Sequence, residues 1–210
     1  MRLNWLERVL VNSPFDTFLL RHFEARRLLA MGGQVRGELA LEIGCGQGVG
    51  AAAITDIFGA ARVHAFDIDP AMLRRARRRL RPRKDTVRLW RGDATAIPIP
   101  DNRYDAVFDF VVIHHIPDWQ HALREIFRVL KPGGRLYAQE GLRRLVLNPV
   151  IRRLVVHPED DPFDHAMFCS GLETAGFHIE NAWHFHEWFG FYIADKPGQG
   201  AAGEMRRNPG

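Results

Sequence analysis

The stretch Leu39-Ala40-Leu41-Glu42-Ile43-Gly44-Cys45-Gly46-Gln47-Gly48-Val49-Gly50 decides the fold of this 210-residue chain. Its first five residues form an apolar run typical of a buried strand, and a segment of small residues follows from about Ala51 to Phe58. Glycine lets the backbone approach a ligand closely, and the N-terminus of a helix presents free N–H groups. We therefore expect a strand, a ligand-binding loop and a helix.

The rest of the chain repeats this alternation of short apolar runs and segments of helical period. Strands are expected at residues 62–66, 87–90, 106–110, 135–139, 177–183 and 189–194, and helices at 70–80, 119–130 and 163–175. Asp69 and Pro70 have the sequence of a helix start, Pro117 and Asp118 open another helix, and Gly176 closes the last. The pattern predicts repeated βαβ units and a mostly parallel sheet, with the last two strands as a hairpin.

Composition excludes several classes of protein. The chain has a mass of 24.0 kDa and only two cysteines, which argues against a disulfide-rich secreted scaffold and a multi-cysteine zinc module. No apolar run approaches the roughly 18 to 20 residues that span a bilayer, and the first eight residues are too charged for a signal peptide. A cytoplasmic location is expected.

Two acids stand where a nucleoside would bind at the carboxyl edge of the sheet. Asp67 ends the second strand and can accept hydrogen bonds from two ribose hydroxyls, and Asp93 follows the third strand. Dinucleotide-binding enzymes also have an acid at the end of the second strand, so Asp67 alone does not distinguish between the two kinds of cofactor. The glycines here, however, fall as Gly44-x-Gly46-x-Gly48 rather than in the G-x-G-x-x-G pattern that accommodates a pyrophosphate.

The segment Glu42 to Gly48 resembles the first motif of the class I S-adenosylmethionine-dependent methyltransferases. Later motifs follow in the same order over roughly residues 38 to 140, namely 66–70, 92–94, 104–107, 113–116 and 128–134. The chain most resembles the small-molecule branch that contains the ubiquinone and menaquinone biosynthesis methyltransferases. The resemblance implies an α/β fold, a Rossmann-like doubly wound seven-stranded sheet, mostly parallel with an antiparallel last strand and with helices on both faces.

The resemblance also implies a cofactor, S-adenosyl-L-methionine, with S-adenosyl-L-homocysteine as product and no metal. The cofactor-binding residues it implies are Glu42, Gly44, Cys45 and Gly46 for the methionine part, Asp67 for the ribose, Ile68, Asp93 and Ala94 for the adenine, and Asp109 and Phe110 near the methyl end. Residues 1–36 would form helices that cover the substrate, 37–195 the methyltransferase domain with an insert at about 141–162, and 196–210 a flexible tail. Asp69 and Asp105 are expected to have structural roles only.

Methyl transfer needs a base only when the acceptor carries an acidic proton. His114 and His115 follow the fourth strand and are the candidate catalytic residues, because imidazole accepts a proton near neutral pH. Glu140, at the end of the fifth strand, is a further candidate. His157, His165, His184 and His186 lack the spacing of a catalytic zinc site, so no metal is expected.

The acceptor is expected to be a small molecule, aromatic or lipid-like, because ten aromatic residues fall outside the nucleotide core. Three alternatives stay open: a nucleic-acid methyltransferase or RNA-binding module, a nicotinamide oxidoreductase, and a non-catalytic cofactor-binding protein. The nucleic-acid alternative rests on residues 71–88, which hold nine of the 29 Lys and Arg and a single acid, Asp85. Since the chain's net charge is only +4, the rest of it is net negative. One solvated helix face explains this run, and neither membrane contact nor oligomeric state follows from it.

Overall fold

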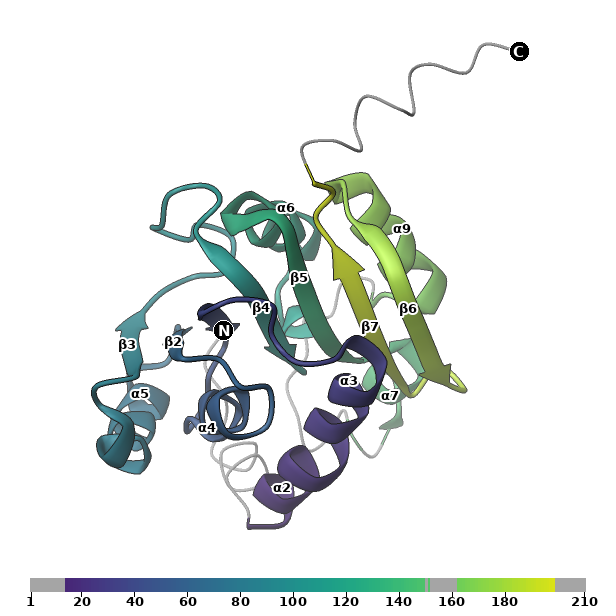
Figure 1. Ribbon diagram of the computed structural model, residues 1–210. Helices are drawn as coiled ribbons and strands as arrows, with labels where there is room; N and C mark the ends of the chain where they lie inside the picture. Colours follow the sequence, from purple (N-terminus) through teal and green to yellow (C-terminus); the bar gives the residue numbers. More distant parts are fainter. Residues whose placement is uncertain (1–13, 150, 152–161, 199–210) are drawn as a thin grey trace.

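A computed structural model describes residues 14–149, 151 and 162–198 of the chain (Figure 1). The first 13 residues of the predicted N-terminal helices lie outside the described residues, as do His157 and the rest of 150 and 152–161 in the predicted insert at 141–162.

A seven-stranded sheet runs through the molecule in the order β3-β2-β1-β4-β5-β7-β6. The strands are β1 (Leu39–Ile43), β2 (Arg62–Asp67), β3 (Val87–Arg91), β4 (Tyr104–Phe110), β5 (Leu130–Gly141), β6 (His178–Phe185) and β7 (Phe189–Asp195). The pairings from β3 to β5 are parallel, and β7 pairs antiparallel with β5 on one side and β6 on the other. The predicted sheet, with its antiparallel last strand, is confirmed. The strand order reverses between β1 and β4, because the chain proceeds to β2 and β3 on one side of β1 and returns to β4 on the other. A crevice is expected at the carboxyl ends of two such strands.

Helices cover both faces of this sheet. One layer holds α2 (Pro14–Leu19), the π-helix η1 (Leu20–Glu24), α3 (Ala25–Gly32), α4 (Val49–Asp56) and α5 (Pro70–Arg79). The other holds α6 (Trp119–Val129) and α9 (His165–Ala175), which pack against each other (Figure 1). The short elements η2 (Arg81–Arg83), η3 (Ile113–His115) and α7 (Arg143–Val146) complete the described chain.

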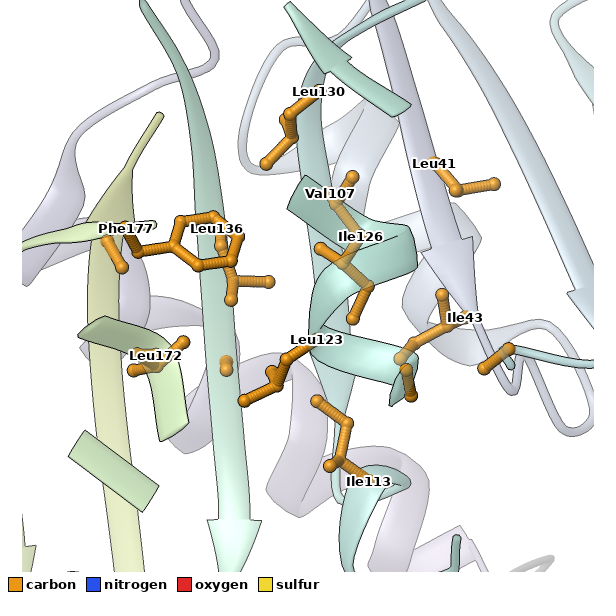
Figure 2. Packing of buried hydrophobic residues seen from close by; sticks show 14 of the residues in the cluster. Leu41, Ile43, Val107, Ile113, Leu123, Ile126, Leu130, Leu136, Leu172 and Phe177 are labelled. Carbon is orange, nitrogen blue, oxygen red and sulfur yellow. The ribbon is translucent and has the colours of Figure 1, made fainter. Parts of the chain in front are cut away.

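The sequence of β1 divides the core between these two layers. Successive side chains of a strand point to opposite faces. Leu41 and Ile43 accordingly join the apolar cluster under α6 and α9 (Figure 2), whereas Ala40 belongs to the cluster under α3 and α4 on the other face. Ala51, Ala52 and Ala53 of α4 are buried, so this helix sits close to the sheet.

Helix boundaries follow their capping residues. Asp69 Oδ1 accepts from the Ala71 N–H at 2.7 Å, and Asp118 Oδ1 accepts from the His121 N–H at 3.1 Å. Gly176 has φ 103°, the left-handed conformation that ends many helices. The three predicted caps are confirmed, and their side-chain bonds anchor two loops at the carboxyl edge.

Asp105 holds the entrance of β1, as predicted for a structural acid. Its Oδ2 accepts from the N–H groups of Glu38 and Leu39 at 3.1 and 2.9 Å, and Lys131 Nζ bonds to Oδ1 at 2.6 Å. These bonds fix the start of β1 against β4, far from the carboxyl edge where β1 ends.

The largest error in a predicted boundary is at the start of β5. Strand β5 begins at Leu130 rather than residue 135, because the Pro132-Gly133-Gly134 segment lies within an irregular stretch of β5 whose register with β4 shifts between Tyr104 and Ala106. The backbone of Lys196 bonds to Gly133 and Gly134, and Lys196 Nζ donates to the carbonyls of Phe127 and Leu130. Lys196, the first residue of the predicted tail, is thus hydrogen-bonded to the segment that joins α6 to β5.

In the part of the chain that the structure describes, every helix is too short or too polar to span a bilayer.

Candidate functional site

A cavity of about 420 Å³ opens at the carboxyl ends of β1, β2 and β4. It is lined by residues from four loops that follow strands: Gly44, Gly46, Phe66, Asp67, Ile68, Asp69, Gly92, Asp93, Ala94, Thr95, Phe110, Val111, Val112, His115, Ile116, Pro117 and Asp118. Eight of the predicted site residues are in this group, namely Gly44, Gly46, Asp67, Ile68, Asp93, Ala94, Phe110 and His115. The sequence motifs therefore converge on one cavity.

The glycine loop after β1 needs glycine for two separate reasons. Gly44 and Gly46 have φ values of 58° and 51°, a region that disfavours residues with a Cβ. A Cβ on Gly44 would also lie 2.5 Å from Val112 Cγ1, so this glycine allows the two loops to pack together. A Cβ on Gly46 would meet no atom within 4 Å. Gly46 therefore borders open space in the cavity.

Asp67 joins the glycine loop to the start of α5. Its Oδ2 accepts from the Gly46 N–H and its Oδ1 from the Asp69 N–H, both at 2.8 Å. Burial raises the pKa of this carboxyl, and the two backbone donors oppose that rise. Each carboxylate oxygen can accept a second hydrogen bond, so Asp67 can still bind two hydroxyl groups from the cavity.

Several backbone N–H groups of this loop are already used within the protein. Cys45 donates to the carbonyl oxygen of Phe66 at 2.8 Å, and Gly46 donates to Asp67. The groups that the loop can offer a ligand are therefore mainly carbonyl oxygens, which accept hydrogen bonds from a cationic amine.

Asp93 lies across the cavity, in the loop after β3. Its Oδ1 accepts from both the N–H and the hydroxyl of Thr95, at 2.9 and 2.8 Å. This turn fixes the carboxylate at the rim, where Asp93 is exposed and Ala94 is buried beside it. Asp93 can thus accept a hydrogen bond from a flat polar ligand edge.

The lining is acidic. Asp67, Asp69, Asp93 and Asp118 all border the cavity, and no lysine or arginine occurs among its lining residues in the described chain. Such a site attracts cations and repels phosphate groups.

Three predicted cofactor-binding residues lie outside this lining: Glu42, Cys45 and Asp109. Alternation along the strands explains the two acids. Glu42 points to the α4 face, where its Oε1 would lie 1.9 Å from a Cβ on Gly50, and Asp109 points to the α6 face. Asp109 is fully buried and does not line the cavity.

Burial changes the acid–base behaviour of these hidden groups. It raises the pKa of Glu42 and of Asp109 well above the usual range, and neighbouring carboxylates add to the rise. Glu42 Oε2 and Asp109 Oδ2 have no hydrogen-bond partner among the described residues. Burial likewise raises the pKa of the Cys45 thiol, which disfavours a nucleophilic thiolate.

The two candidate catalytic histidines differ in position. His114 is buried, and its Nδ1 lies 2.5 Å from Glu140 Oε2, whereas His115 lines the cavity. The two rings contact each other with centroids 4.0 Å apart. Glu140 is fully buried and does not face the crevice as expected, so only His115 has direct access to a ligand.

Sequence reasoning missed the loop that closes the cavity. Val111, Val112, Ile116 and Pro117 line it, and Asp118 does so in addition to capping α6. The dipeptide Pro117-Asp118 is a visible signal at a carboxyl edge. Val111 gives none, because its φ of 63° is imposed by its surroundings.

Among the described residues, no group of three or more His, Cys, Asp and Glu is arranged to hold a metal ion.

Comparison with known proteins gives this geometry a context. The family described as Methyltransferase domain matches residues 41–138. A probable S-adenosylmethionine-dependent methyltransferase of Mycolicibacterium smegmatis is 36% identical over 146 residues, 69% of this chain and 54% of the relative. A demethylmenaquinone methyltransferase of Thermus thermophilus is 34% identical over 139 residues, 60% of this chain and 63% of the relative. The chain thus spans between half and two thirds of the length of these relatives.

The solved structures agree on the fold. A putative methyltransferase in complex with the Trm112 activator of Haloferax volcanii aligns over 88% of this chain and 93% of its own, with a TM-score of 0.73 and 21% identity.

Residues 41–138 therefore match the methyltransferase-domain family, and this part of the chain is similar in sequence to S-adenosylmethionine-dependent methyltransferases. It resembles the ubiquinone and menaquinone biosynthesis methyltransferases, which confirms the resemblance found in the sequence.

Proposed function

We propose that this chain transfers the methyl group of S-adenosylmethionine to a small apolar molecule, aromatic or lipid-like in character. The observation that carries the proposal is the acidic cavity around Gly46, with four aspartates and no lysine or arginine among its described lining residues. S-adenosylmethionine has a sulfonium and an ammonium group, both cationic. A nicotinamide dinucleotide has instead a diphosphate, which such a lining repels.

The residues present fit the cofactor. The open space beside Gly46 offers room for a ligand, and the loop carbonyls can accept from an ammonium group. Asp67 would accept from the ribose hydroxyls and Asp93 from the adenine amino group, with Ile68 against the adenine ring. Glu42 would act behind the loop, through its charge or through water, since it does not reach the cavity itself.

The chemistry requires little from the protein beyond orientation. When bound, the cofactor supplies an activated methyl group on a sulfonium leaving group. Phe110, Val111 and Val112 shape the apolar wall that would hold the acceptor in line. Orientation of two reactants can contribute up to about 7 to 11 kcal/mol to catalysis.

His115 is the candidate base for acceptors that lose a proton. It lines the cavity and is partly buried, so its imidazole can accept the proton of a phenol or an acidic carbon while excluding bulk water. His114 would act behind it, because its Nδ1 is already bonded to Glu140. An acceptor amine would not need this base.

The acceptor class is supported by exposed aromatic residues at the carboxyl end of β6, at the start of β7 and in η1. Trp183, Phe185 and Phe189 are 40, 52 and 37% exposed, and Phe23 is 66% exposed. Arg27 of α3 lies over the Trp183 ring at 4.3 Å, which joins the first helical layer to this group. The name of the Thermus thermophilus relative also points to an isoprenoid quinone precursor. In this proposal the helices of residues 1–36 and the insert at 141–162 cover the acceptor.

Calorimetry and a transfer assay test the proposal together. We expect S-adenosylhomocysteine to bind and NAD⁺ not to bind, and we expect label from [methyl-¹⁴C]S-adenosylmethionine to enter demethylmenaquinone or the lipid fraction of a lysate. Tight NAD⁺ binding without S-adenosylhomocysteine binding would overturn the cofactor assignment. Label confined to RNA or protein would overturn the acceptor class instead.

A further inference from the structure

The loop between β4 and η3 holds an unfavourable backbone conformation at the cavity wall. Val111 has φ 63°, in the left-handed region that β-branched residues rarely adopt. Such a conformation persists only where the surrounding contacts fix it. The Val111 N–H donates to the carbonyl oxygen of Gln139, and Val112 packs directly on Gly44.

Glu140 supplies most of the remaining contacts. Its Oε1 accepts from the N–H groups of Val112 and Ile113 at 3.2 and 2.6 Å, and its Oε2 accepts from the His114 N–H at 3.3 Å. One fully buried carboxylate thus collects three consecutive backbone donors at the start of η3. Asp109 Oδ1 adds a second bond to the Val112 N–H at 3.0 Å.

Through His114, the same carboxylate reaches the cavity without lining it. Glu140 Oε2 lies 2.5 Å from His114 Nδ1. His115 packs on His114 and borders the cavity, as do Val111 and Val112. Loss of Glu140 would therefore release three lining residues together.

The surroundings of Glu140 bear on its charge. Asp109 faces it from β4, His114 from η3 and the hydroxyl of Tyr192 from β7, and His115 lies behind His114. Burial raises the pKa of Glu140 to about 7, and both burial and the Glu140 charge raise that of Asp109. Two carboxyl groups in such contact do not both ionise readily. Glu140, which accepts the larger number of backbone bonds, is the one favoured as the anion.

We propose that Glu140 is a positioning residue of the acceptor side, whose carboxylate holds residues 111–115 in the conformation that forms the cavity wall. This inference rests on the proposed function, since the wall is the surface against which an acceptor would meet the sulfonium methyl group.

Glu140→Gln tests the proposal, with Glu125→Gln as the matched control. Glu125 on α6 also accepts a backbone bond, from the Ile97 N–H at 2.8 Å, but it lies outside the cavity lining. In hydrogen exchange, we expect the amides of Val112, Ile113 and His114 to exchange at least tenfold faster in Glu140→Gln. Glu125→Gln should accelerate Ile97 and leave residues 112–114 unchanged. Unchanged exchange at 112–114 in Glu140→Gln would overturn the proposal.

A second readout separates positioning from simple support of the fold. At pH 8, we expect the ¹³C resonance of bound [methyl-¹³C]S-adenosylmethionine to shift in Glu140→Gln, because residues 111–115 of the cavity wall are displaced, and to stay unchanged in Glu125→Gln. A resonance that is unchanged in Glu140→Gln would overturn the proposal.

The two proposals fail in different ways. Without any bound methyl signal in the natural sequence, the proposed function fails, and hydrogen exchange alone decides the role of Glu140. If Glu140→Gln does not fold, the natural sequence decides instead. The amide resonances of residues 112–114 should then titrate together with that of His114 Nδ1, and independent titrations would overturn the proposal.

Discussion

At the scale of single residues, Asp67 is the side chain whose replacement should affect the cofactor most directly. An amide in place of its carboxylate would turn an N–H toward the backbone donor of Gly46 or Asp69 and would leave one acceptor fewer for the ribose. Leaving such partners unpaired costs about 1 to 3 kcal/mol. We expect Asp67→Asn to raise the Kd of S-adenosylhomocysteine by roughly 5- to 150-fold in calorimetry.

Asp105 provides the control for this measurement. It also accepts two backbone N–H bonds, but at the opposite end of β1. Asp105→Asn should lower the unfolding free energy by about 1 to 3 kcal/mol and leave the Kd unchanged. Equal losses of affinity in both variants would mean that Asp67 acts only through the stability of the loop.

Glu140 should impose a pH dependence on stability. Burial raises its pKa to about 7, so between about pH 4.5 and 7 the folded protein binds a proton that the unfolded chain releases. The unfolding free energy should therefore fall as pH rises through this range. We expect Glu140→Gln to remove part of that fall in urea denaturation at pH 5, 6, 7 and 8.

The pKa of Glu125 shifts in the opposite direction to that of Glu140. Its hydrogen bond to Arg128 lowers its pKa, so its contribution is present above about pH 4.5 and is lost only in more acid solution. Glu125→Gln should leave the slope between pH 5 and 8 as it is. A Glu140→Gln slope equal to that of the natural sequence would show that Glu140 ionises normally in the folded state.

Residues with local partners were the predictable ones. Asp69 bonds to an N–H two positions away, and its role follows from the neighbouring proline alone. Glu140 belongs to β5, and its backbone partners come from the loop after β4, which only the parallel pairing of β4 and β5 brings near. No spacing in the sequence indicates that Glu140 contacts residues 112–114. The resemblance indicated which residues lie near the site, but not which of them face it.

At the scale of elements, the glycine loop has room for an added methyl group at Gly46, but its backbone conformation there disfavours any residue other than glycine. Gly46→Ala would place its methyl group in the open part of the cavity and would impose strain at φ 51°. We expect a loss of about 1 to 2 kcal/mol in unfolding free energy. Calorimetry should show a loss of S-adenosylhomocysteine affinity of more than tenfold.

Gly133 separates the two effects. It has φ 79°, and a Cβ there also meets nothing within 4 Å, but it lies in β5 far from the cavity lining. Gly133→Ala should reproduce the strain and not the loss of affinity. If both variants bind S-adenosylhomocysteine normally, the space beside Gly46 does not belong to the cofactor.

The same glycine shows why the start of β5 was predicted wrongly. Pro132-Gly133-Gly134 is the sequence of a helix stop, and it does follow α6. The strand nevertheless includes it, because Lys196 bonds to the backbone of Gly133 and Gly134 from 60 or more positions along the chain. The preference of Pro-Gly-Gly for a turn can be recognised from neighbouring residues, whereas hydrogen bonds to a residue that follows β7 cannot.

At the scale of the whole molecule, the positive charge lies on α5, which covers the β3 edge of the sheet (Figure 1). Arg74, Arg78 and Arg81 are exposed. We expect their combined replacement by Gln to lower the salt concentration that elutes the protein from heparin, because fewer anions are neutralised. Binding of S-adenosylhomocysteine and transfer to a small acceptor should stay within twofold.

The outcome distinguishes a solvated face from a substrate-binding face. A loss of transfer activity that matches the loss of heparin retention would mean that a polyanion is the acceptor. Replacement of Arg124, an exposed residue of α6 in the other layer, serves as the control for a change in net charge alone.

The position of β7 has a consequence for how the protein is made. This strand pairs with β5 on one side and β6 on the other, yet it is the last of the seven to leave the ribosome. Until it emerges, the nascent chain exposes two unpaired strand edges, which are templates for aggregation. Protein synthesis that stalls before Phe189 should therefore yield material that chaperones must hold or proteases remove, however complete the cofactor-binding half already is.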